Sequence, residues 1–280
     1  MELIMPLRQI DLPVQIDHLR DLGADFTALQ VTVEALTPQP GSELLKKVSP
    51  QILAVHELVG RALIRLHVLD GSQYTAVPGS LVSLATFSTV IGSASAAASQ
   101  LANAVSNNPF EAAGFTDGPL PDMESVQQTR HAEAAPLLKQ GLATAARHLS
   151  LSATCCLHTA SAITNGLTEY PEYRPDLPQL TPAQYAALEL IAQGGARRYA
   201  RFDGPARVEA GNGKAIHSTP FAVLEKHRLV RAARQDGYLV QDVTVAAAGR
   251  LALEFQKPPL SQTKAPGSVP KPSNTSRKPR

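Results

Sequence analysis

Cysteine is scarce in this chain of 280 residues, which has only two, adjacent at Cys155 and Cys156. Two neighbouring thiols cannot build the disulfide framework of a small secreted domain, and they agree with a reducing compartment. Residues 1 to 11 also lack a basic start that leads into a sustained apolar region and a small-residue cleavage site. We therefore expect a cytoplasmic protein.

Motifs for catalysis or metal binding are also missing from the sequence. It contains no HExxH zinc motif and no Gly-x-Ser-x-Gly elbow, and Gly211 to Lys214 lacks the spacing of a phosphate-binding loop and indicates a turn. Cys155 and His158 could share a helical face, but zinc needs four ligands and no further cysteine exists. We predict no catalytic residue, no metal and no cofactor, so the chain is not expected to be an enzyme.

Charged side chains are absent from residues 71 to 110, a segment that includes the apolar run 81 to 98. A membrane-spanning helix is one interpretation of this run. However, the run is rich in Ser, Thr and Gly, lacks basic flanks and carries its large apolar residues on one stripe. These features favour a buried central helix and no membrane partner.

Apolar residues recur every three or four positions through residues 1 to 168, which predicts a mainly α, antiparallel helical bundle. One helix has its stripe from Leu19 to Leu36, a second is expected to start at Ser49-Pro50, and a third near Ser80. The second is expected to bury Ile52, His56, Val59, Leu63 and Leu66. The third has Leu84, Phe87, Ile91, Ala94, Ala98, Leu101 and Val105, and a long fourth has Leu138, Leu142, Ala145, Leu149, Ser152, Cys156, Thr159 and Ile163. Heptad-like spacing of this kind also predicts self-association, as a two-fold dimer.

The distribution of charge separates the front of the chain from its rear. Residues 1 to 176 carry a net charge of −7, residues 177 to 256 carry +3, and residues 257 to 280 carry +6. We expect residues 169 to 180, which are rich in proline, to be a linker, and the basic tail 257 to 280 to be disordered. A basic rear suits an anionic partner such as DNA, although a short basic tail can also be merely a solvated end.

Residues 181 to 256 combine helix and strand signals in a small α+β domain. Thr181-Pro182-Ala183-Gln184 forms a capping box that starts a helix with Tyr185, Ala187, Leu188, Ile191 and Ala192 on one side, and Gly194-Gly195 ends it. A second helix follows an N-cap at Ser218-Thr219, with Phe221, Leu224 and Leu229 on its buried side. Short extended runs are expected at 198 to 203, 206 to 209, 229 to 234 and 238 to 245, the last two joined by Asp236-Gly237 as a hairpin.

This order of elements, together with Thr244, Gly249-Arg250 and the apolar helix up to Leu253, resembles the winged-helix domain of bacterial regulators of the MarR and PadR type. The resemblance covers residues 181 to 253. It implies a DNA-binding, helix-turn-helix type domain in which the helix after Ser218-Thr219 is the recognition helix and the hairpin is the wing. The sequence departs from that pattern at 194 to 216, where an extended segment replaces the second helix of the family.

Two hypotheses follow for function. The first is a cytoplasmic DNA-binding protein of the transcription-regulator type that contacts double-stranded DNA phosphates more than bases, with the bundle for dimerisation or sensing. The second is a non-catalytic scaffold whose winged helix contacts another protein. Base reading is expected to be weak because only Lys226, among the outward residues 220, 222, 223, 225 and 226, is of a base-reading type. The candidate DNA-binding residues are Arg197, Arg198, Lys214, Ser218, Thr219, Lys226, Arg228, Arg231 and Arg234.

Overall fold

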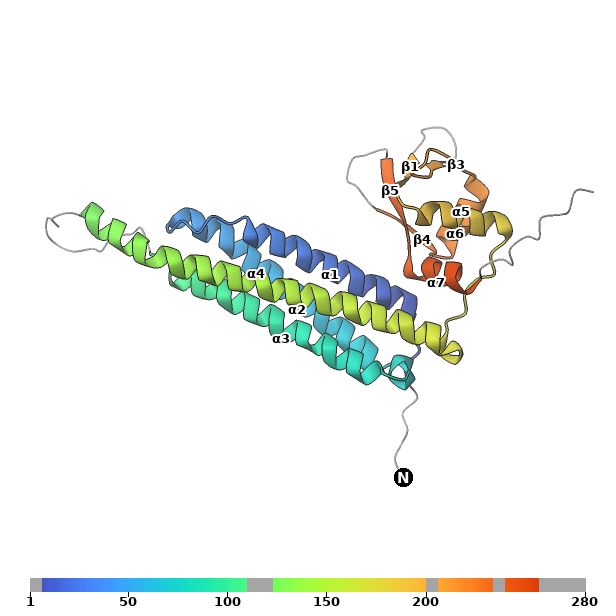
Figure 1. The fold of residues 1–280 in the computed structure, drawn as a ribbon, viewed down its shortest axis with the longest axis horizontal. Coiled ribbons are helices and arrows are strands. Elements are labelled where there is room, and N and C mark those ends of the chain that lie inside the picture. Colours follow the sequence, from blue (N-terminus) through green and yellow to red (C-terminus); the bar gives the residue numbers. More distant parts are fainter. Residues whose placement is uncertain (1–6, 110–122, 200–205, 234–239, 257–280) are drawn as a thin grey trace, which may run out of the picture. The chain divides into compact units, whose positions relative to one another are not determined.

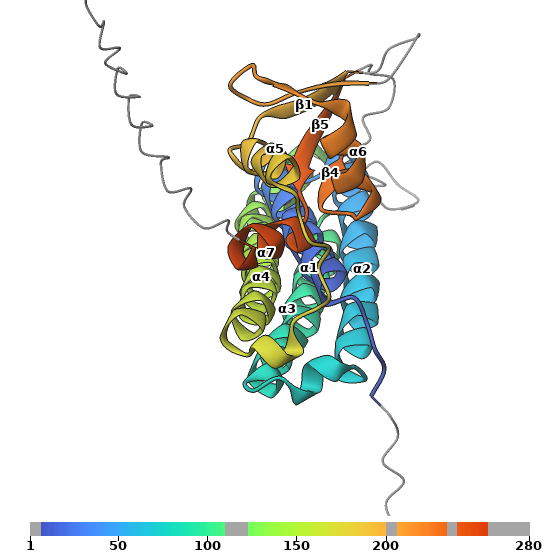
Figure 2. The ribbon, with the colours of Figure 1, turned by 90° about the vertical axis from the view of Figure 1, so that its right-hand side faces the viewer.

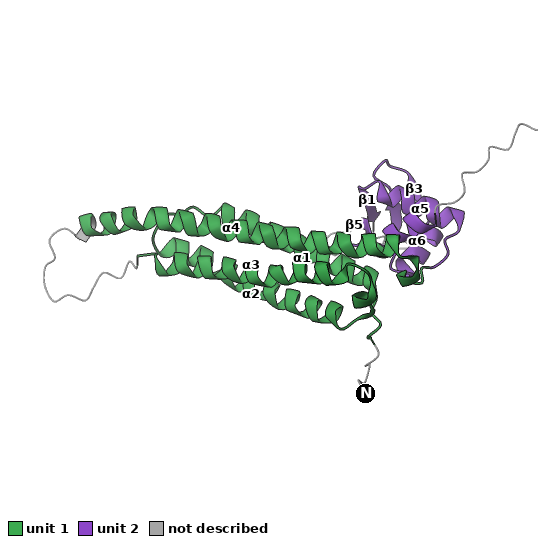
Figure 3. Ribbon diagram, turned by 60° about the horizontal axis from the view of Figure 1, so that its bottom comes forward, with its two compact units in different colours: residues 1–177, 246–248 green, residues 178–245, 249–280 purple. Residues whose placement is uncertain are grey.

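The computed structural model describes residues 7–109, 123–199, 206–233 and 240–256. In these ranges the protein is mostly helical, with a small antiparallel five-stranded sheet near the C-terminal end (Figure 1). The chain divides into two compact units (Figure 3). Unit 1 comprises residues 1–177 and 246–248, and unit 2 comprises residues 178–245 and 249–280.

Four long helices that pack along one another make up unit 1. Its elements are α1 (Leu12–Glu34), α2 (Ser42–Asp70), α3 (Ser80–Ser106) and α4 (Met123–Glu169), with short 3-10 turns η1 (Gln73–Ala76) and η2 (Pro171–Tyr173). Helix α4 lies against both α1 and α3, and α2 lies against the same two helices (Figure 2). The core of the unit is therefore formed by one side of each helix.

Helix α4 confirms its predicted stripe in full, because all eight residues listed for it are buried. Two of them carry hydroxyl groups, and both hydroxyls have hydrogen-bond partners. The hydroxyls of Ser152 and Ser93 are 2.7 Å apart, and the Thr159 hydroxyl donates to the Cys155 carbonyl. Small hydroxyl side chains fit a close helix contact, since each can return its hydrogen bond to the backbone one turn earlier.

Helix α1 begins at Leu12, before the first residue of its predicted stripe. The Asp11 carboxylate accepts the Val14 backbone N–H, which caps the helix, and a proline stands in its first turn. Its stripe from Leu19 to Val33 is buried, whereas Leu36 follows the helix and is half-buried.

The prediction for α2 is wrong at its start and on its buried side. The helix begins at Ser42 and continues through Pro50, and the Ser49 hydroxyl donates to the Leu45 carbonyl instead of capping a new helix. The buried residues are Leu44, Val48, Val55, Leu58, Ala62 and Leu69, whereas Leu63, which was expected inside, is 49% exposed. Burial of apolar residues on both sides of Pro50 keeps the helix continuous despite the amide hydrogen that proline lacks.

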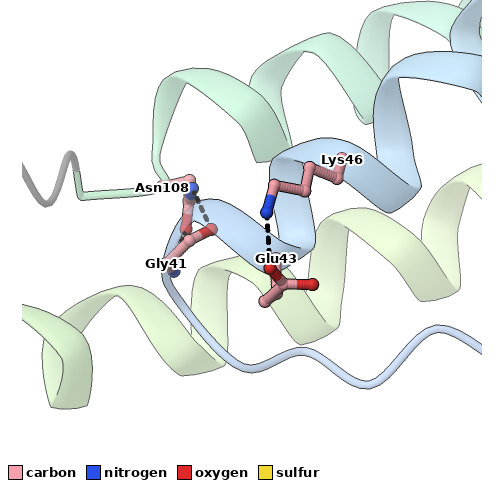
Figure 4. Close-up of polar contacts among 4 residues, drawn as sticks. All are labelled: Gly41, Glu43, Lys46 and Asn108. Atoms are coloured by element: carbon pink, nitrogen blue, oxygen red, sulfur yellow. Dashed lines mark hydrogen bonds and ion pairs between the residues drawn. The ribbon is translucent and has the colours of Figure 1, made fainter.

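Asn108 holds the start of α2 (Figure 4). Its buried side-chain amide donates to the Gly41 carbonyl at 2.9 Å and accepts the Gly41 N–H at 2.8 Å. Gly41 has φ 129°, a conformation that side-chain-bearing residues rarely adopt, so glycine is required there. One turn into the helix, Lys46 and Glu43 form an exposed ion pair at 2.7 Å.

Helix α3 starts at Ser80, as predicted, after Gly79 in a left-handed conformation. Its stripe is partly confirmed, because Leu84, Phe87, Ala94, Ala98 and Leu101 are buried whereas Ile91 and Val105 are only half-buried. Among the described helices it is the one that is long and apolar enough to cross a membrane, with 44% of its most apolar window buried. A core helix meets the same criteria of length and composition.

Unit 2 contains three short helices and the sheet. Its elements are α5 (Pro182–Ala192), β1 (Ala196–Tyr199), β2 (Arg207–Glu209), β3 (Ala215–Ile216), α6 (Ser218–Lys226), β4 (Val230–Ala232), β5 (Val240–Val245) and α7 (Ala247–Phe255), the last beginning at residues assigned to unit 1. The strand order is β3-β2-β1-β5-β4, with every neighbouring pair antiparallel. The capping box of Thr181 and Gln184 is confirmed, and Leu188 and Ile191 are buried, although Ala192 is exposed.

The extended segment predicted between the two helices is confirmed in its described part, which forms β1, β2 and β3. Gly194 and Gly195 both have positive φ and end α5, as expected. The hairpin that was predicted as the wing is formed by β4 and β5, which pair Val230 with Val245. Its tip, including Asp236-Gly237, lies outside the described residues, as does the tail from residue 257.

Close packing in unit 2 requires a glycine at position 249. A Cβ added to Gly249 on α7 would overlap the Leu229 carbonyl oxygen and press on Val245. Only a residue without a side chain lets α7 approach the end of α6 and the start of β4 so closely. Gly249 therefore fixes the packing of these elements.

Candidate nucleic-acid interface

Helix α6, the predicted recognition helix, begins at Ser218, within the predicted N-cap rather than after it. His217 occupies the N-cap position without a side-chain hydrogen bond, so Ser218 and Thr219 are helical residues rather than caps. Phe221 and Leu224 are buried, as predicted. The outward side of α6 consequently presents Ala222, Glu225 and Lys226, with Pro220 and Val223 half-buried.

The C-terminal end of α6 has an unusual residue at its turning point. Arg228 has φ 56° and is the one residue other than glycine with positive φ in the described part of the chain. Its N–H donates to the Glu225 carbonyl at 3.0 Å, and the Leu229 N–H donates to the Leu224 carbonyl at 2.9 Å. This pair of bonds forms a Schellman motif, in which the left-handed position is usually glycine. Here it carries an exposed arginine.

Arg197 and Arg198 are neighbours on β1 and therefore point to opposite faces of the sheet. Arg198 faces the helices. Its guanidinium lies 2.6 Å from the Glu225 carboxylate and 6.0 Å from the centre of the Phe221 ring, both on α6. This arginine is thus engaged in holding α6 to the sheet.

Arg197 lies on the outer face of the sheet, where charges of both signs alternate. Its guanidinium is 3.6 Å from the Asp242 carboxylate on β5, and its direct partner on β2 is Glu209, which forms an ion pair with Arg207. These pairs leave little net charge on the middle of this face. Arg231 is opposite Thr244 at the β4 edge of the same sheet and is exposed.

The remaining predicted residues are spread over separate parts of unit 2. Lys214 is exposed in the turn between β2 and β3, where its N–H donates to the Asn212 side chain. Ser218 and Thr219 are exposed in the first turn of α6, and Lys226 is exposed in its last turn. Arg234 lies outside the described residues. Lys226, Arg228 and Arg231 lie within six residues of one another in the sequence, at the end of α6, in the turn after it and on β4.

Sequence reasoning missed two features of this surface. The pairing of Arg198 with α6 could have been anticipated, because alternation along a strand separates Arg197 from Arg198. The left-handed conformation of Arg228 had no such signal, because glycine or asparagine is the residue type that indicates it.

Residues that could hold a metal do not gather in the described ranges, where no group of three or more His, Cys, Asp or Glu side chains is suitably placed. Cys155 and Cys156 are both buried in α4. The Thr89 hydroxyl on α3 lies 3.3 Å from the Cys155 sulfur. Burial, and then the neighbouring Cys155, raise the pKa of the Cys156 thiol to about 12. A thiol held protonated in this way is a poor nucleophile and a poor metal ligand.

Comparisons with protein-family models, with curated proteins and with solved structures find no match for this chain.

Proposed function

We propose that the protein binds double-stranded DNA through a winged-helix-like domain, residues 181–256, with an antiparallel helical bundle in residues 1–168 for dimerisation or sensing. In this proposal α6 is the recognition helix and the β4–β5 hairpin is the wing. The protein acts as a cytoplasmic, regulator-like protein without a catalytic step.

The order and pairing of the elements support the winged-helix interpretation. Strand β1 follows the first helix α5, and after α6 the chain forms β4 and β5, of which β5 pairs with both β1 and β4. A winged-helix domain has this strand pairing beside its recognition helix. The β2–β3 pair occupies the place in the sequence where the family has its second helix.

The observation that carries the proposal is Arg228 at the left-handed end of α6. A side chain at this position costs on the order of 1 kcal/mol relative to glycine, so the fold alone favours glycine. The arginine instead adds an exposed cation two residues after Lys226, just before β4 of the predicted wing. DNA phosphates are anionic partners that these cations at the C-terminal end of α6 could bind.

The residue types on the outward side of α6 favour contacts to phosphates over contacts to base edges. Base edges in the major groove are read chiefly by Arg, Lys, Asn and Gln. Of the exposed residues on α6, Glu225 is paired with Arg198, and Lys226 alone has such a side chain. Binding should therefore have little sequence preference and depend strongly on salt.

Fluorescence anisotropy with a labelled duplex, at about 50 and about 200 mM salt, tests the proposal, because each neutralised phosphate contributes about 0.9 to the salt slope. The expected result is binding by the full chain and a weaker slope for Lys226→Ala with Arg228→Ala, and for Arg231→Ala with Arg234→Ala. Arg207→Ala is the matched control, since Arg207 is exposed but paired with Glu209. A chain ending at Gln256 separates the contribution of the basic tail.

A scaffold role, in which unit 2 contacts another protein, is the second candidate. It is favoured by the small, neutral residues Ala222 and Val223 on the outward side of α6 and by the missing second helix. No binding to any duplex at low salt would contradict the DNA proposal and favour this one.

A further inference from the structure

A small cavity of about 250 Å³ lies between α1 and α2 in unit 1. Its lining combines charged, titratable and apolar side chains, which are His18, Asp21 and Leu22 on α1 and Arg61, Ile64 and Arg65 on α2. Spacings of three and four residues place each of these sets on one side of its helix. Ordinary ligand pockets have roughly 300–1,000 Å³, so this cavity fits only a small molecule.

Two uncharged groups hold the side chain of Arg65 at the cavity. Its guanidinium donates to the Gln15 side-chain carbonyl at 3.2 Å and lies 2.8 Å from Nδ1 of His18. A guanidinium only donates hydrogen bonds, so Nδ1 accepts, and an imidazole with an accepting nitrogen carries no charge. Among the described residues, no carboxylate forms an ion pair with Arg65. The half-buried charge of Arg65 is therefore oriented but not balanced by an ion pair.

The second arginine of the cavity differs in this respect. Arg61 lies 2.7 Å from the Asp25 carboxylate, so it adds little net charge to the lining. The remaining charged residues of the lining are Arg65 and Asp21, both half-buried and of opposite sign. In the described part of the chain, these two charges line one cavity without an ion pair between them.

We propose that this cavity binds a small zwitterion with an apolar part, of the class of free amino acids with short apolar side chains. The ligand carboxylate accepts from the remaining N–H groups of Arg65, whose planar fork suits a carboxylate. The ligand ammonium donates to Asp21, because a carboxylate can accept several hydrogen bonds at once. The apolar part lies against Leu22 and Ile64, and thereby removes apolar surface of the 54% exposed Ile64 from water.

A zwitterion fits this lining better than an ion of either sign. A simple anion is attracted by Arg65 but repelled by Asp21, and a simple amine meets the opposite combination. A small ligand that carries both charges is attracted by both residues. The inference concerns unit 1 alone, so it goes beyond the proposed function and does not depend on DNA binding.

Equilibrium dialysis of the full chain with radiolabelled leucine measures this binding directly. Two analogues that each lack one charge then compete with it: 4-methylpentanoate lacks the ammonium, and 3-methylbutylamine lacks the carboxylate. Each should bind at least about tenfold more weakly than leucine, because a hydrogen bond between charged groups is lost. Equal or tighter binding of either analogue would overturn the zwitterion. Failure of leucine, valine and methionine to bind at millimolar concentration would overturn the site.

Two variants test the two contacts separately. Arg65→Gln should weaken leucine binding at least about tenfold, but 3-methylbutylamine should bind at least as tightly as to the unaltered chain. Asp21→Asn should weaken leucine binding similarly and leave 4-methylpentanoate bound at least as tightly. Arg147→Gln is the matched control, since Arg147 is exposed on α4, where its guanidinium donates to the Thr144 hydroxyl.

Circular dichroism identifies a variant that fails to fold, and the analogue series on the unaltered chain then decides. Unchanged leucine binding in folded Arg65→Gln or folded Asp21→Asn would overturn the assignment of the contacts. Weakening by Arg147→Gln to the same extent would overturn the location of the site.

Discussion

The guanidinium of Arg198 on β1 lies 2.6 Å from the carboxylate of Glu225 on α6 and also covers the ring of Phe221. Both ion-pair partners are partly exposed, at 30% and 44% of their side chains. An ion pair of this exposure is worth at most about 1 kcal/mol, to which the arginine stem adds packing on the ring. The contact joins β1 of the sheet to α6, so the Arg198 side chain is engaged in packing within unit 2.

We predict that Arg198→Ala lowers the free energy of unfolding of unit 2 by about 1 kcal/mol, since it removes the ion pair and the packing together. Arg198→Ala should weaken DNA binding less than the double variant that combines Lys226→Ala and Arg228→Ala. Chemical unfolding, combined with anisotropy, measures both quantities. A double-mutant cycle with Glu225→Gln should give a coupling free energy of a few tenths of a kcal/mol, and no coupling would contradict the ion pair.

Arg228→Gly separates stability from binding. Because Arg228 has φ 56°, glycine should raise the free energy of unfolding by about 1 kcal/mol. The same change removes the cation at the end of α6 and should weaken DNA binding several-fold. Thermal unfolding measures the change in stability of Arg228→Gly, and fluorescence anisotropy of the same sample measures its change in DNA affinity.

Arg228→Lys is the control for that variant, since it keeps the charge and the strained conformation. It should bind DNA nearly as the unaltered chain does, without a gain in stability. If Arg228→Gly bound as tightly as the unaltered chain, Arg228 would have no part in the interface.

Gly249→Ala should destabilise unit 2 by about 2–4 kcal/mol, because the new methyl group overlaps the Leu229 carbonyl and forces α7 to move. Urea unfolding followed by circular dichroism measures the change. Gly92→Ala in α3 is the matched control, since a Cβ there meets nothing within 4 Å. It should be neutral or stabilise by up to about 1 kcal/mol through helix propensity. Equal effects of the two changes would contradict the close packing of α7.

The two long helices α4 and α2 differ in how far the sequence could predict them. In α4 one unbroken apolar stripe determines which side is buried, and that prediction is confirmed. In α2 apolar residues lie on both sides, so periodicity admits two stripes and only packing against α1 and α3 chooses between them. Pro50 also imitates a helix start, although it stands eight residues inside α2.

The candidate site was predicted less well than the fold. Residue types and net charge identified the basic residues but not where their side chains point. Alternation on β1 separates Arg197 from Arg198, and ion pairs with Asp242 and Glu225 engage both. The conformation of Arg228 depends on the turn between α6 and β4, for which the sequence offers no glycine as a signal.

Residues 10 to 166 are predicted to fold alone as a helical unit, which circular dichroism of that fragment measures. Leu142 is buried on α4, so Leu142→Asp should unfold the fragment, because an uncompensated charge in a core costs several kcal/mol. Its near neighbour Leu137 is 51% exposed. Leu137→Asp should leave the helical signal unchanged, and loss of that signal in both variants would contradict the assigned buried side of α4.

Alkaline pH should destabilise unit 1 through Cys156. The pKa of the Cys156 thiol is raised from 9.0 to about 12. Burial is the larger cause, and the neighbouring Cys155 is the smaller one. A pKa that is higher in the folded state means that the folded chain keeps a proton which the unfolded chain has lost. Stability is therefore complete below pH 9 and falls as the pH rises towards 12.

Urea unfolding between about pH 8 and about pH 10 should show a loss approaching 1.4 kcal/mol per pH unit above the unfolded pKa. Tyr74, whose pKa is raised from 10.0 by burial, begins to add to the slope near the upper end of this range. Cys156→Ala should therefore remove most of the loss up to about pH 9.5, whereas Cys155→Ala should retain most of it, because burial of Cys156 persists. An unchanged slope in Cys156→Ala would assign the alkaline sensitivity to another group.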